Sequence, residues 1–245
     1  MLALTPLIDV VRKCSDMGEV VSHYSELPYP PRDPQDEKRR IVMDPNNTPI
    51  AISHHLWGGA KRFPAASSDA PPFRMLMAGG GTGDASTMFG VAFARAGLKF
   101  QIVHLDLSQS SIDVAKARAA MHSGVAEHVR FVRGSLLEVG SMDLGGAFDF
   151  INCIGAPPPP THSPPRQPAL NRPKANRLFW MFDAGVLHHL SSPQAGLDAL
   201  TSVLKPDGGM NLMVYGELGR RGIYDFHDMY RLLGEAQTAL ETHVF

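Results

Sequence analysis

A glycine-rich turn between an apolar run and a helical pattern constrains this fold more than any other feature. Residues 75–78 are apolar, glycines stand at 79, 81 and 83, and residues 84–96 suit a helix closed by Gly97. Glycine permits the positive φ angles of a sharp turn and lets a ligand approach the backbone. The turn therefore predicts a strand–turn–helix unit that cradles a nucleotide. A tight packing turn without a ligand is the alternative.

Strand and helix patterns continue to alternate along the chain. Ser108 suits the N-cap of a helix over 109–121, and Ser192 and Pro193 suit the start of a helix that residues 205–209 end. Nearly continuous apolar strands joined by helices predict an α/β fold with a doubly wound, Rossmann-like, mostly parallel sheet. Such a sheet binds ligands at the carboxyl ends of its strands. The other expected strands are 100–105, 129–132, 148–153 and 210–215, and a last helix is expected over 224–240.

The first 70 residues differ from this pattern and predict an N-terminal extension that forms a lid. Four prolines within residues 28–34 exclude a helix there, and residues 50–57 suit a short helix. We therefore expect an extension over 1–70 and a ligand-binding domain over 71–245. A proline-rich insert at 156–184 interrupts that domain.

The composition narrows the classes of function. The chain of 245 residues is 44% hydrophobic, its formal net charge is −1, and its Lys and Arg residues are scattered, which argues against an obligate nucleic-acid partner. Its two cysteines, Cys14 and Cys153, cannot build a disulfide framework, which favours a reducing compartment. Short apolar runs and the lack of a secretory pattern predict a soluble, cytoplasmic protein without a membrane span.

An acid at the end of the second expected strand specifies the nucleotide further. Asp106 lies 23 positions beyond Gly83, close to the spacing of about 20 residues expected when the second strand lies beside the first. Its carboxylate can accept hydrogen bonds from both hydroxyls of a ribose. A helix-capping acid before Ser108 is the alternative.

The residues after the turn distinguish two kinds of ligand. A dinucleotide site needs G-x-G-x-x-G, but the third glycine position is Asp84 when counted from Gly79 and Ser86 when counted from Gly81. A carboxylate at the mouth of the turn repels a pyrophosphate and favours a ligand that carries an ammonium or sulfonium group. The pattern therefore favours S-adenosylmethionine over a nicotinamide dinucleotide.

These segments resemble the class I S-adenosylmethionine-dependent methyltransferases. RMLMAGGGTGD (74–84) resembles motif I, and IVHLDLSQSSIDVAKARA (102–119) resembles the acidic second strand with its helix. VRFVRGSLLEV (129–139) resembles the adenine-side segment of the family, and FDFINC (148–153) resembles its fourth strand. GVLHHLSSPQAGLDALTSVLKPDGGMNLMVYG (185–216) resembles the stretch that runs through the fifth strand. The resemblance covers residues 74–155 and 185–230, and residues 20–63 loosely.

The resemblance implies a binding site for S-adenosylmethionine. Asp106 would hold the ribose hydroxyls, and Leu107 would flank the adenine. Ser135 and Leu136 would lie beside the adenine amine, although many relatives have an Asp where this chain has Ser135. The turn, which would line the methionine and ribose part, comprises Ala78, Gly79, Gly80, Gly81, Thr82 and Gly83.

The donor end of the expected site involves four further residues. Asn152 and Cys153 would face the methyl group. The family commonly has an acid at the position of Met77, so Asp84 is the substitute candidate for contact with the amine of the cofactor. The prolines come too late after Asn152 to match the Asn-Pro-Pro-aromatic motif of amino methyltransferases.

Two features depart from the family pattern. The insert at 156–184 separates segments that are almost contiguous in the family, and it has three interpretations: a disordered excursion, a gene-model artefact, or a substrate lid or docking arm. The family normally adds two strands after the fifth, whereas this chain reaches residue 245 after one helical stretch. We therefore expect an exposed edge beside the fifth strand unless a partner or the N-terminal region covers it.

No catalytic residue or metal site stands out in the sequence. The histidine pairs at 54–55 and 188–189 point apart on a helix and cannot act as an i, i+4 metal pair, although either histidine of the second pair could serve as a general base. Cys153 suits a buried thiol better than a nucleophile. The expected function is methyl transfer from S-adenosylmethionine to an unidentified acceptor. The alternatives are a nicotinamide-dependent oxidoreductase and a degenerate, non-catalytic S-adenosylmethionine-binding paralogue.

Overall fold

The computed structural model describes residues 28–41, 48–61, 63–154, 186–187, 190 and 192–214, with further single positions at 218, 221–222, 225, 229 and 232. The chain divides into two units, 1–213 and 214–245, and every element named below belongs to the first. Some expectations fall on residues outside the described ranges. These are the insert at 156–184, the histidines at 188 and 189, and most of the helix expected at 224–240.

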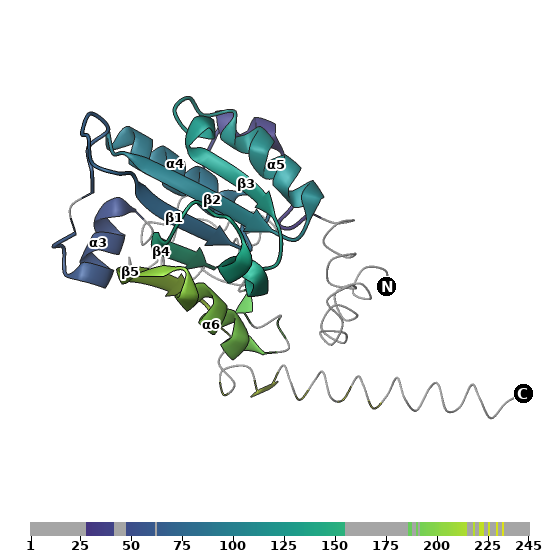
Figure 1. The fold of residues 1–245 in the computed structure, drawn as a ribbon. Helices are drawn as coiled ribbons and strands as arrows, with labels where there is room; N and C mark the ends of the chain where they lie inside the picture. The colour runs from purple at the N-terminus through teal and green to yellow at the C-terminus, as the bar shows by residue number, and fades with distance from the viewer. Residues whose placement is uncertain are drawn as a thin grey trace, which may run out of the picture. The chain divides into compact units, whose positions relative to one another are not determined.

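The centre of the first unit is a sheet of five parallel strands (Figure 1). The strands lie in the order β3-β2-β1-β4-β5, so the sequence moves outward from β1 to one edge and then to the other. All four strand pairs are parallel. The expected doubly wound parallel sheet is thus confirmed. The strands are β1 (Phe73–Ala78), β2 (Phe100–Asp106), β3 (Val129–Arg133), β4 (Phe148–Cys153) and β5 (Leu204–Leu212).

Helical elements cover both faces of the sheet. The helices α4 and α5 follow β1 and β2 on one face, where α3 also packs, and α6 and η4 contact each other on the other face. This is the arrangement that right-handed crossovers impose when the chain moves in both directions from a central strand. The helical elements are η1 (Pro34–Lys38), α3 (Pro49–Trp57), α4 (Asp84–Arg95), α5 (Gln109–Ala119), η3 (Ala126–His128), η4 (Leu136–Ser141) and α6 (Pro193–Ser202).

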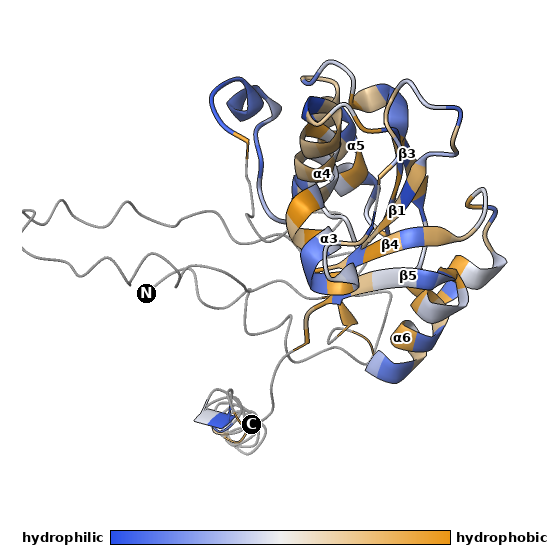
Figure 2. Cartoon of the chain, turned by 90° about the vertical axis from the view of Figure 1, so that its left-hand side faces the viewer, coloured by the Kyte–Doolittle hydropathy of each residue, from blue (hydrophilic) through white to orange (hydrophobic). Residues whose placement is uncertain are grey.

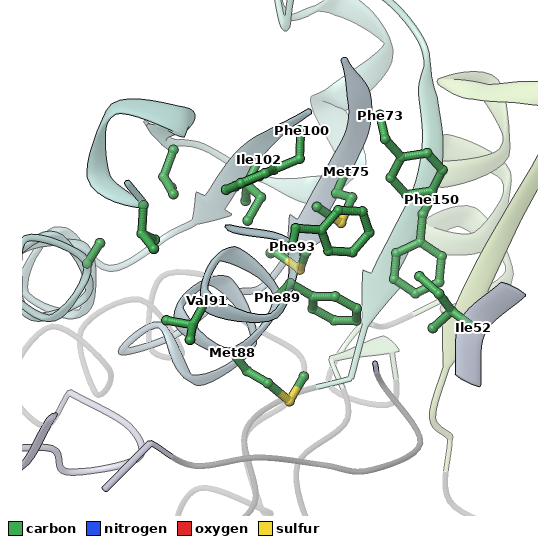
Figure 3. Packing of buried hydrophobic residues seen from close by; sticks show 14 residues of the cluster. Ile52, Phe73, Met75, Met88, Phe89, Val91, Phe93, Phe100, Ile102 and Phe150 are labelled. Atoms are coloured by element: carbon green, nitrogen blue, oxygen red, sulfur yellow. The ribbon is translucent and has the colours of Figure 1, made fainter. Parts of the chain in front are cut away.

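The two faces of the sheet bury two separate apolar clusters. The cluster beneath α4 is rich in aromatic rings, and Phe73 stacks on Phe93 with ring centroids 5.6 Å apart (Figure 3). Ile52 brings α3 into this cluster beside Phe150. The second cluster is aliphatic and includes Leu200 of α6. β4 is hydrophobic along most of its length (Figure 2), as expected for a strand buried on both faces.

Local signals explain where the helices begin and end. The hydroxyl of Ser108 accepts a hydrogen bond from the Ser111 amide, and the hydroxyl of Ser192 accepts one from the Ala195 amide, so both expected N-caps are confirmed. Gly97, with φ +64°, follows the end of α4. α3 lies over residues 49–57, close to the expected 50–57.

The expected start of the fifth strand was wrong. β5 begins at Leu204 rather than at residue 210, because residues 205–209 do not act as a separate turn. Residues 205–208 bulge out of the strand, because Phe148 pairs with Leu204 and Phe150 pairs with Gly209, so Asp149 alone lies opposite these four residues of β5. Pro206 is tolerated there because it lies in a bulge.

The N-terminal region contacts β5 through α3, and the expectation that it covers the edge beside this strand stays a prediction. A Cβ atom on Gly209 would lie 2.5 Å from Cδ1 of Leu56 in α3. The indole Nε1 of Trp57 donates a hydrogen bond of 2.8 Å to the carbonyl of Asp207. α3 therefore contacts β5 both at the bulge and just after it.

Candidate functional site

The glycine loop, defined as residues 79–83, joins the carboxyl end of β1 to α4. Gly79, Gly81 and Gly83 have φ angles of +69°, +52° and +94°, which a residue with a Cβ atom rarely adopts. The sharp turn expected from the sequence is therefore present. Asp106 ends β2, which pairs directly with β1, so the loop and this acid lie at the same edge of the sheet.

The glycines are required by the protein's own packing as well as by any ligand. A Cβ atom at any of four loop positions would lie under 3.0 Å from other protein atoms. The close neighbours are Val186 for Gly79, the His104 ring for Gly80, the Tyr29 carbonyl for Gly81 and Ala115 for Gly83. Four different segments therefore contact the loop where side chains would otherwise project.

All five backbone amides of the loop donate hydrogen bonds within the protein. The amides at 79 and 80 donate to the Leu105 carbonyl, and the Gly83 amide donates to the Gly80 carbonyl. The Gly81 amide donates to Oδ2 of Asp106 over 2.7 Å, and the Thr82 amide donates to the Tyr29 carbonyl over 3.3 Å. None of the five is available to an anion, which distinguishes this loop from phosphate-binding loops whose amides point at the ligand.

The Asp106 carboxylate joins the two strand ends. Its Oδ2 accepts from the Gly81 amide, and its Oδ1 accepts from the Ser108 amide over 2.9 Å. Burial raises the pKa of this carboxyl group, while the amides of Ser108 and Gly81 oppose the change. A carboxylate has about four acceptor sites, so two hydroxyl groups can still bond to it.

The expected adenine side lies at the ends of β2 and β3. Leu107 is half-buried, and its carbonyl accepts a hydrogen bond of 3.1 Å from Nε of Arg133. Leu136 is buried in the aliphatic cluster. The Ser135 hydroxyl caps η4 by accepting from the Leu137 amide. Leu136 and Leu107 can offer apolar surface, whereas the Ser135 hydroxyl already has a structural role.

Asn152 and Cys153 lie at the carboxyl end of β4 on opposite faces of the sheet. Asn152 pairs in register with Met77 of β1. It is buried, and its Oδ1 has no hydrogen-bond partner among the residues that the structure describes. Cys153 is buried in the aliphatic cluster, and burial raises the pKa of its thiol to about 12. Only the backbone of Cys153 can contact a ligand at this edge, and its thiol is the buried group that the sequence indicated.

Asp84 has a different role from the one expected. Its carboxylate is buried and bonded to two guanidinium groups: Nη2 of Arg32 lies 2.5 Å from Oδ2, and Nη1 of Arg118 lies 2.6 Å from Oδ1. The structure therefore argues against Asp84 as the substitute for an acid at Met77, because each of its oxygens already accepts from two guanidinium nitrogens. The argument from repulsion of a pyrophosphate also loses its basis, because the charge of Asp84 is matched.

His104 is a residue of this site that the sequence analysis missed. Its ring is fully buried beneath Gly80, and its Nδ1 lies 2.8 Å from the Ser86 hydroxyl at the start of α4. Burial lowers the pKa of His104 to about 4. A histidine inside an apolar strand, two residues before the acid, was the available signal.

The remaining expectations concern the histidines of α3, metal sites and membrane spans. His54 and His55 are exposed on α3, and within the described ranges no three His, Cys, Asp or Glu side chains group closely enough to hold a metal ion. No helix in the same part of the chain has both the length and the apolar character of a membrane span. The residues expected around one ligand do lie together, at the carboxyl ends of β3, β2, β1 and β4.

The chain is similar in sequence to known proteins. No protein-family model matches it. An uncharacterized protein of a Synechococcus strain, syc1184_c, is 30% identical over 213 residues, which are 86% of this chain and 40% of the relative. The chain thus spans two fifths of the length of that relative.

Solved structures align with part of this chain at low identity. The CMeT domain of the citrinin polyketide synthase has a TM-score of 0.41 and 18% identity, over 62% of this chain and 30% of that one. A methyltransferase from Thiobacillus denitrificans in complex with S-adenosylhomocysteine has a TM-score of 0.36 and 22% identity, over 71% and 51%. The glycopeptide N-methyltransferase MtfA with S-adenosylmethionine has 0.36 and 16%, over 59% and 47%. These similarities cover only part of each chain.

Proposed function

We propose that this chain binds S-adenosylmethionine at the carboxyl ends of β1 and β2 and transfers its methyl group to an acceptor. The observation that carries the proposal is the combination of a carboxylate that can accept further hydrogen bonds with a loop whose amides are all engaged. Among the described residues, the Asp106 carboxylate accepts hydrogen bonds from the amides of Gly81 and Ser108, and the five loop amides offer nothing to a phosphate. A ligand with a ribose diol and without a phosphate matches both properties.

The residues at this edge suit each part of that ligand. Asp106 would accept from the ribose hydroxyls, and Leu107 and Leu136 would contact the adenine. The glycine loop would lie along the methionine part. Oδ1 of Asn152, which has no partner within the described part of the chain, supports a polar contact at the end of β4, because a buried acceptor without a partner is costly.

A dinucleotide suits the site less well. Its pyrophosphate needs amide donors from the glycine turn and a third glycine that lets helix and strand approach closely. Here the amides from Gly79 to Gly83 are engaged, and Ser86, at one of the two third-glycine positions, fills the space with a hydrogen bond to His104. These contacts replace the repulsion argument as the reason to favour S-adenosylmethionine.

Catalysis would consist mainly of positioning. When bound, S-adenosylmethionine supplies a methyl group that its sulfonium already activates. The protein's part is to hold the ligand, orient the acceptor nucleophile in line with that methyl group and exclude water. The acceptor is unidentified, and the cytoplasmic location expected from the sequence stays a prediction.

Calorimetric titration tests the proposal. The chain should bind S-adenosylhomocysteine, and NAD⁺ should not bind at the same concentration. Asp106→Asn should weaken binding of S-adenosylhomocysteine about tenfold to a hundredfold, because hydrogen bonds to a charged group contribute about 1.5–3 kcal/mol each. Asp113→Asn, at an exposed position of α5, is the matched control.

The outcomes separate three cases. Binding of NAD⁺ in preference to S-adenosylhomocysteine, or equal affinities of Asp106→Asn and the parent, would overturn the proposed site. Binding of S-adenosylhomocysteine without transfer of a radiolabelled methyl group to any component of a cell extract would support a non-catalytic binding protein instead.

A further inference from the structure

The segment before η1 lies directly against the glycine loop. The Tyr29 carbonyl accepts from the Thr82 amide, and the Pro30 carbonyl accepts from the Thr82 hydroxyl over 2.7 Å. The Tyr29 carbonyl also occupies the space of a side chain at Gly81. Residues 29–30 therefore shape the outer side of the loop, although they are about 50 positions away in the sequence.

A buried set of charged side chains holds this segment in place. Arg32 bonds to Asp84 through both Nε and Nη2, and Arg118 bonds to Asp84 and to Glu37 of η1. We call these four residues the loop cluster. Their side-chain exposures are 10% for Arg32, 5% for Asp84, 1% for Arg118 and 3% for Glu37.

The loop cluster connects three parts of the chain through matched charges. Arg32 precedes η1 and Glu37 lies within it. Asp84 is the first residue of α4, and Arg118 lies on α5. Arg118 also donates 2.9 Å to the Thr82 carbonyl, so the cluster reaches the loop itself. Two guanidinium groups face two carboxylates, and His122 contacts the second oxygen of Glu37. Charge balance is what allows these groups to be buried.

We propose that the loop cluster makes residues 29–32 a fixed wall of the ligand site, and that Arg32 is a positioning residue for the loop. The inference rests on the proposed function, because it assigns the wall to the amino-acid half of S-adenosylmethionine. The wall determines where the Thr82 end of the loop lies. The adenine side lies at the ends of β2 and β3, so we expect it to depend on Arg32 less than the loop does.

The test compares two ligands on the same variants. S-adenosylhomocysteine has the amino-acid half and adenosine lacks it, so Arg32→Gln should lower the affinity for S-adenosylhomocysteine tenfold or more and the affinity for adenosine less than threefold. Arg32→Lys should recover part of the loss. Lys61→Gln is the matched control, because it removes a cation from the N-terminal region at the amino end of the sheet.

Thr82 provides a second pair of variants that keeps every charge. Thr82→Val removes the hydroxyl bond to Pro30, whereas Thr82→Ser keeps it, so only the valine variant should lose selective affinity for S-adenosylhomocysteine. This pair decides the matter if Arg32→Gln fails to fold, as judged by circular dichroism.

The outcomes test the positioning role of the wall and the proposed function separately. If the parent binds both ligands and the Arg32 and Thr82 variants match it, the wall has no positioning role. If Arg32→Gln weakens both ligands equally, Arg32 supports the fold alone and the inference is wrong. If the parent binds neither ligand, the proposed function itself fails.

Discussion

Two groups of ion pairs connect the N-terminal region to the rest of the fold, and they differ in burial. The loop cluster lies at the carboxyl end of the sheet with side chains 1–10% exposed. The second group, which we call the bulge cluster, comprises Lys61, Asp149, Lys205 and Asp207 at the bulge of β5. Its side chains range from 10% to 73% exposed.

The difference shows what each group can contribute. A buried charge depends on its partner, because removing one partner leaves the other desolvated and uncompensated. An exposed pair competes with water and is screened by salt. By our proposal the loop cluster orients the glycine loop, whereas the bulge cluster adds to a contact that Trp57 and Leu56 already make.

The largest expected effect comes from Arg118. Arg118→Met removes the group that bonds to both carboxylates of the loop cluster, and we expect the free energy of unfolding to fall by about 3–5 kcal/mol. Urea unfolding followed by circular dichroism measures it. A loss below about 1 kcal/mol would show that the cluster is hydrated in solution, and the contrast with the bulge cluster would disappear.

His104 sharpens the comparison, because it is a buried basic group that has no carboxylate partner among the residues the structure describes. Its pKa of about 4 lies below the ordinary value of 6.5, so the unfolded chain binds the proton more tightly and stability falls as the pH drops from about 6.5 to 4. The loss should be on the order of 3 kcal/mol relative to His104→Gln. Unfolding midpoints of both proteins at several pH values measure it, and parallel curves would contradict it.

Asp106 differs from the acids of the loop cluster, because its carboxylate is bonded to backbone amides instead of guanidinium groups. Because burial raises its pKa, acidification should protonate it earlier than an exposed Asp and weaken the binding of S-adenosylhomocysteine. Asp106→Asn should bind more weakly, and its affinity should be nearly independent of pH. Titration calorimetry over the same pH range measures both, and an equal pH dependence in the two proteins would assign the effect to another group.

The smallest effect is expected in the bulge cluster. Lys61→Gln should leave the unfolding midpoint within the error of the parent, and any difference should vanish at high salt. A shift as large as that of Arg118→Met would mean that burial does not separate the two clusters. Repeating the urea titration at low and high salt decides between these results.

The sequence predicted the parts of the molecule that local pattern controls. Strands β1 to β4, the caps at Ser108 and Ser192, and the turn at residues 79–83 all follow from apolar runs and from Gly, Ser and Pro positions. The start of β5 was missed, because residues 205–208 have the composition of a turn, and local pattern does not reveal that they form a bulge between two positions paired with β4.

The candidate site was predictable in position but not in its internal contacts. The order of the strands brings Asp106 and the glycine loop together, as the motif spacing indicated. The partners of Asp84 lie 34 and 52 positions away, and no local pattern links Arg32, Glu37 and Arg118. The burial of His104 likewise depends on how α4 packs over β2, which spacing does not reveal.

The engaged amides of the glycine loop have one more consequence. A loop that already satisfies its own backbone is preorganised, so it has little conformational entropy left to lose when a nucleoside arrives. Association should then need no rearrangement at this edge, and hydrogen exchange at Gly81 and Thr82 should be slow even in the empty protein.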